Sequence, residues 1–409
     1  MCKLYINLMT TSSVASKKPH LTTFTLWIMT IATGLVVANI YYNQPLLGDI
    51  AHTYHASNGA AGRISMITQI GYAVGMFFIV PLADMFKRKR MMLYIIAIVI
   101  VALLGAATAP SINILIFASF LIGAASLIPQ LLIPMAAHLA NPSERGKKIG
   151  VVMGGLLIGI LLSRTLSGFV GAHWGWRAMF YIAAALMLIT WFVILLFLPE
   201  VEPDYTGSYK KLMGSLIDLF KNEPKLRFAS LRGALCFACF SAFWTTIVFL
   251  LKENFNMGSD AAGLFGLVGA FGAIAAGLMG RLSDKMDPFK LSFFTLLLVL
   301  VSFIVFIFSS HSIAGLIIGV IILDMGVQAT HISNQSIIFS LNAGARNRIN
   351  TIYMVSYFIG GSAGTFMVSV LWGNYHWLGV CISGIILSSI AIIVHLLNHR
   401  SRQKKANPA

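Results

Sequence analysis

Twelve apolar runs of about 20 residues each divide this 409-residue chain, and a run of that length can cross a lipid bilayer as a helix. The runs cover residues 24–47, 62–83, 91–109, 112–138, 149–171, 177–198, 228–251, 261–282, 289–309, 313–340, 349–372 and 377–397. Charged residues make up only 10% of the sequence, whereas a typical soluble domain has about 25%. The sequence therefore predicts an all-α polytopic membrane protein with twelve transmembrane helices.

The basic residues indicate which helix ends face the cytoplasm. Most of the 29 Lys and Arg residues lie in the N-terminal tail, in every second loop and in the C-terminal tail. Short loops rich in Lys and Arg stay on the cytoplasmic side of a membrane. We therefore expect both termini in the cytoplasm. We attribute the net charge of +16 to membrane topology and contact with the lipid bilayer, not to nucleic-acid binding.

A short pattern repeats at half the length of the chain. Leu82 and Asp84 stand at the end of the second run, and Leu282 and Asp284 stand 200 positions later. A repeat at this spacing predicts two equivalent halves. We expect pseudo-symmetric six-helix bundles at 24–198 and 227–397, basic cytoplasmic tails at 1–23 and 398–409, and a cytoplasmic linker with an amphipathic helix at 199–226.

Polar residues mark one face of the tenth run. Asp324 is the one acid deep within a predicted span, and Gln328, His331 and Gln335 follow on the same helical face with Asn334 at its border. Such a face lines water or a polar interface, or it forms an internal hydrogen-bond network. A buried carboxyl and a His can both change protonation near neutral pH, as a proton-coupled carrier requires. We therefore assign proton coupling to Asp324 and His331.

Arg164 lies near the middle of the fifth run, where an unpaired cation is costly. Asp324 is the deep carboxylate that can neutralise it, so we hypothesise an Arg164–Asp324 ion pair between the two halves and include Arg164 in proton coupling. The alternative is an Arg164 held by backbone carbonyls and polar side chains. Arg232 lies closer to the end of its run, and we expect it to extend to the cytoplasmic surface.

Further polar residues lie in the first and fourth runs. Asn39 and Asn43 share one helical face, and Tyr42 lies beside them. Gln130 stands where two prolines weaken the fourth run. We expect these four side chains to face a cavity; helix–helix hydrogen bonding is the alternative for the first run.

Enzymatic chemistry has no signature in this sequence. No cluster of Ser, His and Asp resembles a nucleophile with its base, and no metal-ligand spacing or phosphate-binding loop is evident. We expect neither an enzyme nor an ATP-driven pump, no cofactor, and a proton gradient as the energy source.

Two loops carry a family signature. The first copy contains Leu82, Asp84, Arg88 and Lys89, and the second contains Gly280, Leu282, Asp284 and Lys285. With the twelve spans, these loops resemble the major facilitator superfamily, whose signature reads G-x-L-x-D-R-x-G-R-R. The stretches Asn39–Pro45, Gly159–Gly168 and Asp324–Gln328 look like the drug-exporter side of that superfamily, close to its acriflavine-sensitivity branch.

The resemblance implies spans 1, 4, 7 and 10 around a central cavity, and rocker-switch alternating access by a monomer in the bacterial inner membrane. The expected cavity residues are Asn39, Tyr42, Asn43, Gln130, Trp244, Gln328 and Asn334. The expected gating residues are Asp84, Arg88, Asp284 and Lys285. Asp84 is expected to cap the eleventh span near Arg348, and Asp284 the fifth span near Lys148. For Arg88 the alternative is a role in topology alone.

The first functional hypothesis is a secondary active transporter that exports drug-like cationic or neutral amphiphiles in exchange for protons, because one acid and several aromatics suit such ligands. One alternative is a carrier for a sugar or amino-acid metabolite, whose hydroxyl and amide groups the Asn and Gln side chains would bind. Another is a membrane receptor that transports nothing.

Overall fold

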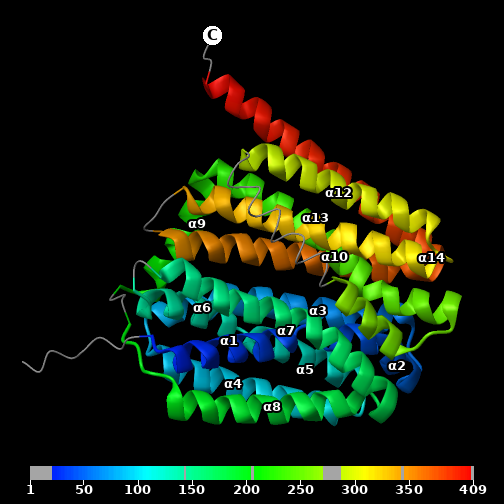
Figure 1. Ribbon diagram of the computed structural model, residues 1–409, viewed down its shortest axis with the longest axis horizontal. Coiled ribbons are helices and arrows are strands. Elements are labelled where there is room, and N and C mark those ends of the chain that lie inside the picture. Colours follow the sequence, from blue (N-terminus) through cyan, green and yellow to red (C-terminus); the bar gives the residue numbers. More distant parts are fainter. Residues whose placement is uncertain (1–20, 142–143, 204–206, 270–286, 342–344, 407–409) are drawn as a thin grey trace, which may run out of the picture.

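The computed structural model describes residues 21–141, 144–203, 207–269, 287–341 and 345–406. Every regular element in these ranges is helical. Long helices lie side by side along one axis, and the elements of the first and second halves of the chain occupy separate regions (Figure 1). Within the described ranges, nine helical stretches are long and apolar enough to cross a membrane.

The first half contains the elements expected for six spans. They are α1 (Thr23–Ala38), α2 (Asn43–Thr53), α3 (Asn58–Phe78), the 3-10 turn η1 (Val80–Asp84), α4 (Arg88–Ala107), α5 (Ile112–Ala125), α6 (Ile128–Leu139), α7 (Arg145–Trp174) and α8 (Trp176–Phe197). Two predicted spans are interrupted. Turns at 39–42 and 126–127 separate α1 from α2 and α5 from α6, and a proline in the first turn of α6 fits a helix start there.

The second half follows the linker helix α9 (Tyr209–Asn222). Its elements are α10 (Pro224–Phe255), helical residues 259–269, α12 (Pro288–Phe308), α13 (Ile313–Phe339) and α14 (Arg346–Ala406). Residues 259–269 are the described part of the predicted eighth span. The last two predicted spans form α14, which breaks at His376, where φ is 44° and ψ is −137°.

Small residues set the distance between helices in each half. Gly155 and Gly159 of α7 pack against the α1 backbone at Thr30 and Gly34. Gly360 and Gly364 of α14 pack in the same way against α10. Because helices in a membrane associate through close packing, these glycines allow the backbones to approach.

The two ends of the molecule differ. We call the end that carries Arg88, Lys148 and Arg348 the basic end. At the opposite end the halves touch, because Asn58 Nδ2 of α3 donates to Glu253 Oε1 of α10 at 3.3 Å. Closer to the middle of the molecule, Thr165 Oγ1 of α7 donates to the Gly263 carbonyl at 3.0 Å.

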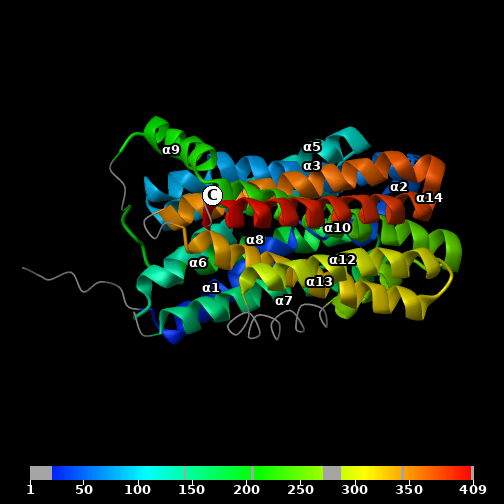
Figure 2. The same ribbon diagram turned by 90° about the horizontal axis from the view of Figure 1, so that it is seen from above.

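At the basic end, α9 lies against η1, α10 and α14, and Figure 2 shows it at one end of the helix bundle. Its amphipathic pattern explains this position, since Leu212 and Leu216 are buried while Lys211 and Asp218 are exposed. Tyr209 donates its hydroxyl to the Phe78 carbonyl at 2.9 Å. The helix predicted in the linker is therefore present, and it connects with both halves.

The α1–α7 contact gives a first prediction. A methyl group at Gly155 overlaps the Thr30 backbone, whereas a methyl at Gly154 meets no atom within 4 Å. We expect Gly155→Ala to lower the free energy of unfolding by about 1–3 kcal/mol. Gly154→Ala should be neutral or stabilising by up to about 1 kcal/mol, since Gly disfavours helix. Thermal unfolding in detergent checks both; equal unfolding temperatures for the two variants would contradict the close approach.

Candidate functional site at the seam between the halves

Three buried side chains meet in the middle of the molecule. Arg164 comes from α7 in the first half, and Trp244 and Asp324 come from α10 and α13 in the second; their exposed fractions are 1%, 1% and 3%. The guanidinium carbon of Arg164 lies 4.1 Å from the centroid of the Trp244 ring. Trp244 Nε1 donates to Asp324 Oδ1 at 3.3 Å. One indole thus contacts a cation with its face and a carboxylate with its edge.

The hypothesised ion pair between Arg164 and Asp324 is not formed directly. Both residues are described, and none of the ion pairs within 4.0 Å joins them. The indole of Trp244 contacts both groups instead. Arg164 Nε donates to Gln44 Oε1 of α2 at 2.9 Å, so the alternative of polar side-chain support describes part of its environment.

Glycines bring the second half close to this cluster. A Cβ at Gly263 would lie 2.8 Å from the Arg164 carbonyl oxygen, and one at Gly266 2.9 Å from the Arg164 Cβ. A Cβ at Gly269 would overlap Oδ2 of Asp324. Residues 259–269 can pack against both charged residues because these three positions lack side chains.

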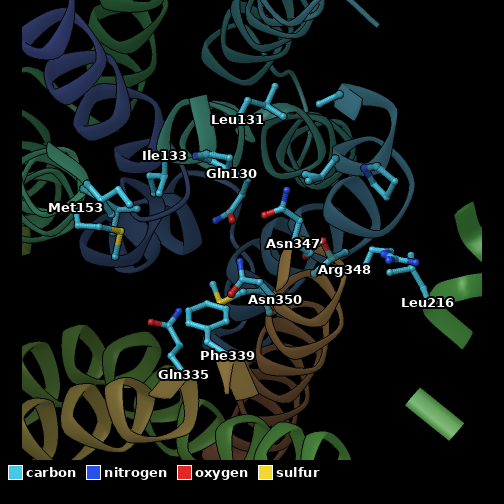
Figure 3. Close-up of a pocket in the computed structure, with 18 of the residues that line it drawn as sticks. Gln130, Leu131, Ile133, Met153, Leu216, Gln335, Phe339, Asn347, Arg348 and Asn350 are labelled. Atoms are coloured by element: carbon cyan, nitrogen blue, oxygen red, sulfur yellow. Dashed lines mark hydrogen bonds between the residues drawn. The ribbon is translucent and has the colours of Figure 1, made fainter. Parts of the chain in front are cut away.

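A cavity of about 280 Å³ opens at the basic end. Its polar lining comes from both halves, with Gln130 from α6 and with Gln335, Asn347 and Asn350 from α13 and α14 (Figure 3). His331 also lines it, and its Nδ1 lies 3.1 Å from the Tyr353 hydroxyl. Three residues that the sequence analysis assigned to the site, Gln130, His331 and Arg88, therefore line one cavity, and Asn350 was missed.

The polar residues of the first predicted span do not line this cavity. Asn39 Nδ2 lies 3.2 Å from Met187 Sδ of α8. Asn43 receives a hydrogen bond from Ser65 at 2.6 Å and donates to Thr68 Oγ1 at 3.1 Å, both in α3. Tyr42 is buried with them. In this structure the side-chain amides of Asn39 and Asn43 join helices, as in the alternative considered for the first run.

Asn334 and Arg232 form a separate buried cluster. Arg232 is fully buried and does not extend to the surface, because its Nη2 and Nε donate to Asn334 Oδ1 at 2.9 and 3.2 Å. Its Nη1 lies 3.1 Å from His395 Nδ1. Asn334 is thus engaged by Arg232, and the partly buried Gln328 lies outside the cavity lining.

The predicted gating loop is anchored on the linker. Lys87 Nζ lies 2.7 Å from Glu202 Oε1, and the Lys89 backbone N–H donates to Glu200 Oε1 at 3.0 Å. A carboxylate at the start of α4 is favourable there. Arg88 is buried and lines the cavity. The side chain of Asp84, and both Asp284 and Lys285, lie outside the described part of the chain, so their capping roles stay predictions.

Sequence reasoning missed the residues that surround Arg164. Gln44 Oε1 accepts a hydrogen bond from the Nε of Arg164. The ring centroids of Tyr41 and Phe240 lie 4.9 and 5.4 Å from its guanidinium carbon. Gln44 follows directly after Asn43 in the polar first span, so its polarity within an apolar run was a usable signal. Tyr41 and Phe240 had none, since aromatic residues are common throughout such runs.

The Trp244–Asp324 contact gives a second prediction. Trp244→Phe keeps an aromatic side chain but removes the N–H and one ring of the indole. We expect it to lower the free energy of unfolding by at least about 1–3 kcal/mol, because a buried acceptor is left short of a donor. In an Asp324→Asn background the loss should be smaller. Detergent titration of the protein in bicelles measures all four corners of this double-mutant cycle.

The matched control is Trp377→Phe, whose Nε1 donates to the Phe306 carbonyl at 3.0 Å. Its effect should add to that of Asp324→Asn. Additivity of Trp244→Phe with Asp324→Asn would show that the two residues are not coupled.

Comparisons with known proteins give the family. Residues 26–365 match the model of the Major Facilitator Superfamily. The chain is 40% identical over 381 residues to a putative uncharacterized transporter, YgaY, of Escherichia coli K12, covering 93% of this chain and 96% of that protein. It is 28% identical over 256 residues, 60% of this chain and 61% of the other, to the 3-(3-hydroxy-phenyl)propionate transporter of the same organism. A solved bacterial homologue of the human lysosomal transporter Spinster aligns with a TM-score of 0.76 at 15% identity, over 93% of this chain and 97% of that one. This chain belongs to the Major Facilitator Superfamily of membrane transporters.

Proposed function

We propose that this protein is a proton-coupled secondary transporter of small aromatic amphiphiles in the bacterial inner membrane, with its basic end in the cytoplasm and Asp324 as the group that binds the coupled proton. The observation that carries the proposal is the Trp244 indole, which contacts Asp324 in its own half and Arg164 in the other. A change of charge at Asp324 therefore acts on a contact that crosses the seam.

The coupling follows from the chemistry of that contact. A hydrogen bond to an ionised carboxylate is about twice as strong as one to a neutral group. Protonation of Asp324 weakens its hold on the Trp244 N–H and frees the indole to move. The ring face then leaves the Arg164 guanidinium, and a contact that joins the halves near the middle of the membrane is lost. The halves can then rock about the seam, which supports alternating access.

The direction of transport depends on how substrate and proton share the site. Efflux of drug-like amphiphiles in exchange for protons is the direction implied by the family resemblance, and it requires substrate and proton to displace each other. Co-transport of an organic acid with a proton is a second candidate. It is favoured by the two terminal nitrogens of Arg164, which have no acceptor within the described ranges, and by the relative named as a 3-(3-hydroxy-phenyl)propionate transporter.

The experiment measures proton exchange by the purified full-length protein in weak buffer. Cationic dyes, aromatic acids, sugars and amino acids are added in turn, and the pH change is recorded beside binding. We expect at least one aromatic amphiphile to change the proton content of the protein, because its binding alters the charge balance around Asp324. Proton release would indicate exchange, and proton uptake would indicate co-transport.

Asp324→Asn is expected to abolish the proton signal while binding persists. The matched control is Asp218→Asn, which neutralises an exposed acid on α9 and should leave the signal intact. Binding with an unchanged proton signal in Asp324→Asn would remove Asp324 from the coupling role. Binding to the wild-type protein without any proton signal would overturn proton coupling.

A further inference from the structure

We infer that Arg164 binds the carboxylate of an aromatic organic acid, and that this acid is the substrate class of the transporter. We call Arg164, Trp244 and Asp324 the central cluster. The inference rests on the proposed function, because it takes this cluster as the transport site and names the ligand that the cluster binds. The argument begins with the donors of Arg164 that the protein leaves open.

Arg164 is buried and only partly hydrogen bonded. Its Nε donates to Gln44, but neither Nη1 nor Nη2 has an acceptor among the residues that the structure describes. Buried polar groups are almost always paired, because leaving a donor without a partner in an apolar interior is unfavourable. Two adjacent unpaired nitrogens of one guanidinium form the planar fork that binds both oxygens of a carboxylate. The open donors therefore fit a monocarboxylate ligand.

The carboxylate that sequence analysis assigned to Arg164 is engaged elsewhere. Asp324 Oδ1 accepts from Trp244, and its Oδ2 lies against Gly269. Within the described chain, none of the ion pairs involves Arg164. An external anion can thus bind the fork without displacing an internal partner.

Aromatic rings surround the same guanidinium. The rings of Trp244, Tyr41 and Phe240 have their centroids 4.1, 4.9 and 5.4 Å from its central carbon. Arginine stacks well on aromatic faces, and such rings also bind the flat apolar body of a ligand. A ligand that satisfies both the fork and the rings carries an aromatic group next to its carboxylate.

A continuous row of rings connects this site with the cavity at the basic end. His331 lines the cavity and lies 4.9 Å from the centroid of Tyr357. Tyr357 stacks on Phe237 at 4.0 Å, and Phe237 stacks on Phe240 at 5.5 Å. Phe240 in turn contacts Arg164. Direct ring contacts thus link the surroundings of Arg164 with a residue that lines the cavity.

The position of Asp324 sets the sign of the pH dependence. The charged or titratable groups that act on Asp324 are Arg164 from α7 and Tyr357 from α14. Tyr41 from the α1–α2 turn lies against Arg164, and His331 lies further along α13. A carboxylate bound at Arg164 adds a second negative charge beside Asp324, and like charges in a dry site repel. Protonation of Asp324 removes that repulsion. Binding of the anion and binding of the proton therefore strengthen each other.

The test compares three ligands that share one ring system and differ in charge. They are 2-naphthoate, its neutral amide 2-naphthamide, and the cation 2-naphthylmethylammonium, titrated by calorimetry into the full-length protein in nanodiscs. We expect naphthoate to bind at least about tenfold more tightly than the other two. We expect the affinity for naphthoate to rise as the pH falls from about 8 to about 6, a range in which naphthoate itself stays ionised. In weak buffer, naphthoate binding should be accompanied by the uptake of protons. Equal or tighter binding of the amide or the cation would overturn the inference.

Variants locate the anion site. Arg164→Lys keeps the charge but loses the fork, and we expect naphthoate affinity to fall by about tenfold. Arg164→Gln should abolish the preference for naphthoate over its amide. The matched control is Arg177→Lys, since Arg177 also lies on a tryptophan face, 4.3 Å from the Trp176 centroid, but donates to Tyr54 and the Ala109 carbonyl. If Arg164→Lys and Arg164→Gln both keep the wild-type preference for naphthoate over naphthamide, the assignment of the anion site to Arg164 is wrong. If the variants do not fold, the three-ligand comparison on the wild-type protein still tests the inference.

Two outcomes separate this inference from the proposed function. If naphthoate binding depends on Arg164 but no proton is taken up, the anion site is supported and proton coupling is refuted. If another ligand gives a proton signal that depends on Asp324 while naphthoate does not bind, proton coupling is supported and the anion site is refuted.

Discussion

The contact of one indole with two opposite charges is the interaction on which the rest of the site depends. A direct buried ion pair between Arg164 and Asp324 would be hard to break, since removing a partner from such a pair costs about 3–5 kcal/mol. Trp244 replaces it with a cation–π contact and a hydrogen bond to the carboxylate. Each is worth about 2 kcal/mol when buried. Two weaker contacts in series can be released one at a time during a transport cycle.

The glycines of the eighth predicted span place this contact where the halves meet. Gly263 and Gly266 allow the helical residues 259–269 to lie against the backbone of α7 at Arg164. Gly269 leaves room for the Asp324 carboxylate. Any separation of α7 from this helix therefore changes the distance between Arg164 and Trp244. The packing that closes the opposite end and the charge arrangement in the middle are thus linked through one helix–helix surface.

The sequence predicted the fold and the charged members of the site, because charge within a long apolar run is rare and unfavourable without a role. Asp324 and Arg164 stood out for this reason. Their arrangement could not be predicted from the sequence, because the position of the Trp244 ring between them depends on the packing of α7, α10 and α13. Asn39 and Asn43 show the limit of polarity as a signal, because amides in a membrane join helices as readily as they line cavities. Arg232 was expected at the surface because it lies close to the end of its run. Its partners Asn334 and His395 are 102 and 163 residues away along the chain, so the sequence did not reveal them.

Charge balance indicates how the central cluster couples an anion to a proton. With Arg164 and ionised Asp324 alone, the cluster is neutral, and with a bound carboxylate and a protonated Asp324 it is neutral again. The half-loaded states carry one net charge each, and an isolated charge in a dry interior is strongly unfavourable. Only the empty and the fully loaded cluster can then be occluded at low cost between the two halves. Both occluded states of the proposed co-transport are neutral, so the membrane potential, which acts on each moved charge by about 2.3 kcal/mol per 100 mV, does no work on that step. The proposed co-transport would therefore be driven by the pH gradient and the gradient of the acid alone.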